Sequence, residues 1–155
     1  MSIKNWIFGS EERIAAKKYN NQLMTLINDN EQDISAMNAA MISQDFKKAK
    51  QVCETWERNI DERIRKVAAA ENFNGDDSLK KAIMKGLHVY RKIVTEDYPW
   101  LIDIRSGRAV TSMGPNLEEV RLEERLLDNI NDAFETAAMM VNNARQEFKQ
   151  KVKHL

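Results

Sequence analysis

The spacing of apolar residues along the chain predicts four long amphipathic helices. In the first, apolar side chains recur every three or four positions up to about residue 42, and two asparagines fall in the same register. Ser10 is expected to cap this helix, with Glu11 and Glu12 in its first turn, where the helix dipole favours acidic groups. The positions in register are Asn20, Leu23, Ile27, Asn30, Ile34, Met37 and Met41.

The next two helices are predicted on either side of a tight turn. The second follows a break at residues 43–45, with Ser43 as its cap, and ends near Asn72. Asn-Gly-Asp at residues 74–76 is a turn signal, and Asp77 or Ser78 is expected to cap the third helix. The apolar positions of the second helix are Phe46, Ala49, Cys53, Trp56, Ile60, Ile64 and Val67, and those of the third begin with Leu79, Ile83, Leu87, Tyr90 and Val94.

Pro99 interrupts the third helix. Proline lacks a backbone donor and clashes with the preceding turn, so a kink or restart is expected near Tyr98–Pro99. Residues 105–116, which contain two glycines and Pro115, are predicted to form a loop, and loops of that length are often functional. A fourth helix is expected from about Leu117, with apolar positions at Leu127, Ile130, Phe134, Ala137, Val141, Ala144, Phe148, Val152 and Leu155.

These elements predict an all-α fold, an elongated antiparallel up-and-down bundle of about four long helices. Short connections favour antiparallel neighbours. A chain of 155 residues is long enough for one domain with a core that needs no disulfide or metal. We expect a single domain over residues 10–155, preceded by an apolar lead at residues 1–9.

Charge and hydropathy exclude several function classes. The chain has 24 Lys and Arg against 24 Asp and Glu, whereas proteins that coat phosphate usually carry a basic surplus, so nucleic acid is not an expected partner. No apolar run reaches the roughly 20 residues of a membrane span, and the first ten residues lack the apolar stretch of a signal peptide. A cytoplasmic location is therefore expected.

No motif in the sequence predicts an enzyme, and neither a metal nor another cofactor is expected. The two histidines, His88 and His154, lack the Glu-x-x-His spacing of di-iron bundles, and His88 beside the apolar face favours a hydrogen-bonded structural histidine. Cys53, the only cysteine, falls on an apolar stripe, which favours a buried, unreactive thiol. The paired glutamates at 118–119 and 123–124 favour a solvated helix face.

Two groups of residues are candidates for binding. The lead carries Ile3, Trp6, Ile7 and Phe8, which is more apolar surface than a solvated tail needs, so it either docks on its own bundle or binds a partner protein. Asn20 and Asn30 lie on an apolar seam. They fix helix register, lie at the rim of the bundle, or bind a ligand in a pocket that Trp56 and Tyr90 would complete.

Several short elements resemble a family of uncharacterised bacterial helical proteins, often described as surface proteins. They are Tyr19-Asn20, the Gly75-Asp76 turn with Ser78-Leu79-Lys80, Tyr90, and Gln146-x-Phe148-x-x-Lys151. The resemblance implies a helical fold and a surface or secreted location, but no activity and no site residues. Members of that family tend to begin with an export signal, which residues 1–10 do not resemble.

The sequence thus predicts a non-enzymatic protein–protein interaction module, such as an adaptor, chaperone or immunity-type bundle, whose partner is another protein. Association of the chain with itself stays open, because a strict apolar seam can be covered within one chain or between two. The alternative is a small-ligand sensor or carrier with a pocket in the bundle core.

Overall fold

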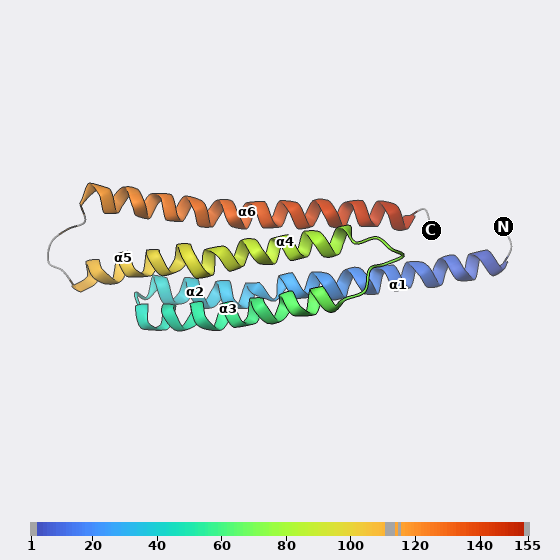
Figure 1. The fold of residues 1–155 in the computed structure, drawn as a ribbon, viewed down its shortest axis with the longest axis horizontal. Coiled ribbons are helices and arrows are strands. Elements are labelled where there is room, and N and C mark those ends of the chain that lie inside the picture. The colour runs from blue at the N-terminus through green and yellow to red at the C-terminus, as the bar shows by residue number, and fades with distance from the viewer. Residues whose placement is uncertain (1–2, 111–113, 115, 154–155) are drawn as a thin grey trace.

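The computed structural model describes residues 3–110, 114 and 116–153, with side chains at 11–109, 114 and 116–153. Its helices form four antiparallel rods (Figure 1). The first rod is α1 (Ile3–Asn28) with α2 (Asn30–Ile42), and the second is α3 (Phe46–Ala69). The third is α4 (Ser78–Lys92), the π-helical turn η1 (Ile93–Asp97) and α5 (Tyr98–Val110), and the fourth is α6 (Leu117–Lys153). The predicted all-α up-and-down bundle is confirmed.

The first rod differs from its prediction at both ends of α1. The helix begins at Ile3, so the expected cap at Ser10 is wrong, and residues 3–9 continue into α1 without a break. Gly9 inside a helix costs only about 1 kcal/mol, which does not stop it. The helix ends instead at Asn28, and α2 starts at Asn30, where the sequence predicted one continuous helix.

Asp45, not Ser43, caps α3. Its carboxylate accepts a hydrogen bond from the Lys48 amide at 3.0 Å, whereas the Ser43 hydroxyl donates back to the Ala39 carbonyl at the end of α2. A carboxylate at the cap position satisfies an amide that the helix itself leaves without a partner. The helix ends at Ala69, three residues before the expected Asn72.

The predicted turn at residues 74–76 is present. Phe73 and Asp76 exchange backbone hydrogen bonds, and both residues between them, Asn74 and Gly75, have positive φ angles of 51° and 77°. Asparagine and glycine tolerate that left-handed conformation best. Asp77 holds the cap position of α4 without a side-chain cap bond, while Asp76 accepts from the Ser78 amide at 2.8 Å.

Near Tyr98–Pro99, where the sequence predicted a kink or a restart, the helix continues through a π turn. The Tyr98 amide bonds to the Ile93 carbonyl, five residues back. In a regular α-helix, the ring of Pro99 would clash with the backbone carbonyl four residues earlier. The wider π turn relieves that clash. Past Pro99, α5 continues to Val110, so the predicted loop at 105–116 is wrong over residues 105–110, and Gly107 lies inside the helix. Residues 111–113 and 115 of the predicted loop lie outside the described residues.

The apolar stripes of all four rods meet in one continuous core. Trp56 is its largest fully buried side chain. On α6, Leu126 is buried and Leu127 only half-buried, a shift of one position from the predicted stripe. Glu123 is also not on a solvated face as predicted, because it pairs with Arg105 at 3.1 Å and Arg108 at 2.7 Å and ties α5 to α6.

Candidate functional site

One of the two predicted seam asparagines, Asn30, belongs to a hydrogen-bonded network between the first two rods. Asn30 is 1% exposed. Its side-chain oxygen accepts from the indole nitrogen of Trp56 and from the guanidinium of Arg63, both at 2.9 Å, and its amide donates to the Ile27 carbonyl at 2.8 Å. Both lone pairs of that oxygen are therefore used by the protein itself.

Arg63 extends this network to the break between α1 and α2. It forms an ion pair with Asp33 at 3.2 Å and donates to the Asp29 carbonyl at 3.3 Å. Asn59 donates to the other oxygen of Asp33 at 3.2 Å. We call Asn30, Asp33, Trp56, Asn59 and Arg63 the Asn30 network. The sequence left three roles open for Asn30: fixing helix register, lying at the rim, or binding a ligand. The geometry of the network agrees with the first of these roles.

The four residues proposed for a core pocket do not all come together. The rings of Trp56 and Tyr90 pack with centroids 6.5 Å apart, close to Asn30. Tyr90 in turn packs on Phe134 of α6 at 5.7 Å. Burial raises the pKa of Tyr90, and the Glu31 carboxylate adds to the rise. Asn20 lies nearly three helical turns away from Asn30, half-buried beside Asn21.

The side chains of Ile3, Trp6, Ile7 and Phe8 lie outside the described ones, but their backbone is the start of α1. This end of α1 extends past the other helices (Figure 1). The five residues from Glu11 to Ala15 are exposed, and Ala16 is the first buried residue among the described side chains. We call residues 3–15 the N-terminal arm. Ile14 on the arm is 67% exposed.

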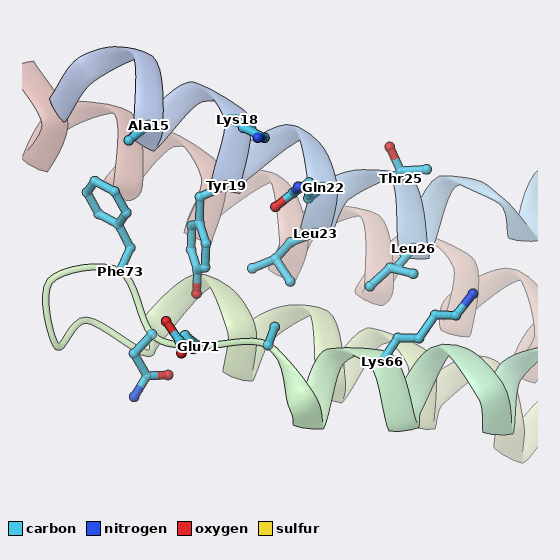
Figure 2. Close-up of a pocket in the computed structure, with 12 residues that line it drawn as sticks. Ala15, Lys18, Tyr19, Gln22, Leu23, Thr25, Leu26, Lys66, Glu71 and Phe73 are labelled. Atoms are coloured by element: carbon cyan, nitrogen blue, oxygen red, sulfur yellow. The ribbon is translucent and has the colours of Figure 1, made fainter. Parts of the chain in front are cut away.

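A groove of about 790 Å³ lies beside the base of the arm, between α1 and the end of α3. Figure 2 shows Leu23 and Leu26 pointing into it from α1, with Phe73 at one end and Lys66 at the other. The Tyr19 ring closes it by packing on Phe73 and Phe148, at 5.6 and 5.7 Å. This α1–α3 groove has apolar walls and polar side chains at its rim.

The outer side of α1 carries a shallower hollow of about 460 Å³. Ile14 lies at one end, and Lys17 and Lys18 follow it along the helix. Lys18 also lines the α1–α3 groove. The arm, this hollow and the groove therefore form one continuous surface along α1.

A further hollow, of about 580 Å³, lies between α4, η1 and α6. We call it the α4–α6 hollow. Asp97 of the π turn lies in it and is 8% exposed. Burial raises the pKa of Asp97, while a hydrogen bond from Asn129 and the charge of Lys92 partly oppose the rise. His88 also lines this hollow and is exposed, whereas the sequence predicted a hydrogen-bonded structural histidine beside the apolar face.

Sequence reasoning missed Asp97, although a signal was present. Asp97 follows Val94 by three positions and therefore continues the apolar stripe of the third rod. An acidic residue on such a stripe, two positions before a proline, coincides here with a π turn, and π turns are frequent at functional sites.

Other chemistry is sparse in the part of the chain that the structure describes. Cys53 is buried, and burial, with Glu54 and Glu57 adding to it, raises the pKa of its thiol to about 12. Over residues 3–110, 114 and 116–153, no group of three or more His, Cys, Asp or Glu side chains could hold a metal ion. No helix among the described residues is long and apolar enough to span a membrane.

Comparison of the chain with models of protein families, with curated proteins and with solved structures found no match.

Proposed function

We propose that this chain is a non-enzymatic protein–protein interaction module that binds an amphipathic helix of another protein along α1. The observation that carries the proposal is the N-terminal arm, which extends beyond the bundle and exposes Ile14 next to the α1–α3 groove. An exposed apolar side chain beside a groove with apolar walls is the arrangement that helix-in-groove recognition uses.

The chemistry of the surface indicates what the partner helix carries. The half-buried Leu26 and Phe73 suit a stripe of apolar side chains at three- and four-residue spacing. Lys17 and Lys18 lie on the exposed side of α1, and Lys66 lies across the groove. Acidic side chains flanking the apolar stripe would complement these lysines and speed association.

The second function class, a ligand pocket in the bundle core, gains no support at Asn30. Its side-chain oxygen is already satisfied by Trp56 and Arg63, and a ligand would have to displace both donors. An adaptor, a chaperone and an immunity-type protein remain equally supported forms of this proposal. The cytoplasmic location that the sequence predicts also remains a proposal.

Affinity capture from the native cells tests the interaction proposal. The baits are the full chain, a deletion of residues 1–9, and Ile14→Asp. Met139→Asp on α6 is the matched control, because Met139 is 61% exposed and Ile14 67%. We expect one partner to be retained by the full chain and by Met139→Asp and to be lost with the other two baits.

All four proteins should melt at nearly the same temperature, because Ile14 and Met139 are exposed and the start of α1 extends past the other helices. Surface changes usually alter the free energy of unfolding by less than about 0.5 kcal/mol. A partner that binds the deletion and Ile14→Asp as well as the full chain would refute the arm as the binding surface.

A further inference from the structure

Apart from Lys92, which acts on Asp97, the basic and acidic side chains of the α4–α6 hollow lie toward opposite ends of it. Because α4 and α6 are antiparallel, its two ends can be located from contacts across it. Outside the lining, a side chain added to Gly86 would lie 3.3 Å from Val141, and this pair marks the direction of the first end. At the second end, Asn129 hydrogen-bonds to Asp97. Lys85 and His88 therefore lie toward the first end, and Asp97 and Asp132 toward the second.

The middle of the hollow is apolar. Val89 and Ile93 come from the third rod, and Ala133 comes from α6. Ile93 is fully buried, and Val89 and Ala133 are half-buried, whereas Lys85, His88 and Asp132 are exposed. The charged groups thus surround an apolar floor. A volume of about 580 Å³ lies within the usual range of small-molecule sites.

We propose that the α4–α6 hollow binds an elongated zwitterion, a ligand with an amine at one end, a carboxylate at the other and an apolar chain between them. Its amine lies at the end of Asp97 and Asp132, and its carboxylate lies at the end of Lys85 and His88. Nine residues separate His88 from Asp97, roughly 13 Å along the helix axis, so the two charges of the ligand are well apart.

The buried carboxylate of Asp97 gives this end its preference for an amine. A carboxylate removed from water lacks solvation, and an ammonium group supplies both an opposite charge and hydrogen-bond donors. Asn129 already forms a hydrogen bond to the Asp97 carboxylate. Lys92 lies on the same wall and acts on Asp97 as well. The ligand amine therefore has to approach from the Asp132 side.

Calorimetric titration of the full chain with three matched probes tests the proposal. The probes are 8-aminooctanoic acid, octanoic acid and octylamine, which share the chain and differ only in their charged ends. We expect binding of 8-aminooctanoic acid at least about tenfold tighter than binding of either singly charged probe. Equal binding of octanoic acid or octylamine would overturn the proposal, and so would no binding of 8-aminooctanoic acid.

Three variants locate the binding. Asp132→Asn and Lys85→Met change exposed side chains at opposite ends of the hollow, so both should fold normally. Each variant should weaken the binding of 8-aminooctanoic acid about tenfold. In Asp132→Asn the affinity should fall close to that of octanoic acid, and in Lys85→Met close to that of octylamine. Asp128→Asn, one turn away on α6 and exposed, is the control and should leave binding unchanged. Unchanged binding in Asp132→Asn and Lys85→Met would place the ligand elsewhere and overturn the assignment.

Discussion

The indole nitrogen of Trp56 donates a hydrogen bond of 2.9 Å to the side-chain oxygen of Asn30, and both residues are at least 99% buried. The two lie 26 positions apart in the sequence. Trp56 is the centre of the α3 stripe, and Asn30 is the first residue of α2. This bond therefore holds the restart of the first rod against the middle of the second.

Asn30→Leu should destabilise the fold by about 2 kcal/mol, because it leaves the buried donors of Trp56 and Arg63 without their acceptor. Urea unfolding followed by circular dichroism measures the loss. Asn38→Leu on the exposed face of the same helix is the control and should change the free energy of unfolding by less than about 0.5 kcal/mol. Equal effects of the two changes would refute the register-fixing role.

Arg63→Met should lower the free energy of unfolding by about 3 kcal/mol, because the nearly buried Asp33 carboxylate is then left without its cation. The side chains of the pair are only 13% and 11% exposed. Adding Asp33→Leu should restore part of the stability, since no buried charge is then left unpaired. A double-mutant cycle with urea unfolding measures the coupling, and additive effects would show that the pair does not interact.

Gly86→Ala should destabilise the fold by about 1 kcal/mol, although alanine is the better helix former. Its Cβ would lie 2.7 Å from Cδ1 of Ile27 and 3.3 Å from Val141, where α4 meets α1 and α6. Ile27→Val removes that Cδ1 atom. The variant that carries both Gly86→Ala and Ile27→Val should therefore lose less stability than the two single variants lose together. In contrast, Gly107→Ala meets nothing within 4 Å and should stabilise α5 by about 0.5–1 kcal/mol. Thermal melts of the four variants and of the unaltered protein show whether each change stabilises or destabilises the fold.

Asp76 should make stability depend on pH in the acid range. A hydrogen bond from Lys151 at 2.6 Å, with further bonds from Ser78, lowers the pKa of this carboxyl from 3.8 to about 2. A lowered pKa means that the stabilisation is fully present above the ordinary pKa and is lost as the pH falls from about 4 through 2.

Asp76→Asn should therefore lower the melting temperature at pH 7, and the difference from the unaltered protein should shrink as the pH approaches 2. Asp77→Asn, in an exposed ion pair with Lys81, is the neighbouring control and should have little effect. A difference at pH 7 that persists unchanged at pH 2 would contradict the role given to the Asp76 charge.

Cys53 should not react with a disulfide reagent in the folded protein. A thiol pKa of about 12 leaves roughly one in ten thousand molecules as thiolate at pH 8. Unfolding in guanidinium should release one reactive thiol per chain, since Cys53 is the only cysteine. Rapid reaction of the folded protein at pH 8 would show that the α3 stripe opens around this residue.

The sequence determined the helices, their order and most of the core. The stripe through Ala49, Cys53, Trp56, Ile60 and Val67 is buried as its spacing predicts, because helical periodicity depends only on residues within a few turns of each other. The turn at Asn74–Gly75 and an irregularity of the helix near Pro99 were also predictable, because both follow from the backbone restrictions of single residues.

Only the tertiary structure decided what the polar residues do. Asn30 fits three roles until Trp56 and Arg63, 26 and 33 positions away, are placed around its side-chain oxygen. Asp97 and His88 lie on one rod, and the hollow that they share is completed by residues of α6 that follow more than 30 positions later. The exposure of the N-terminal arm depends on where the other helices end, because α1 extends past them. Burial, pairing and concavity come from contacts distant in sequence, which local periodicity does not contain.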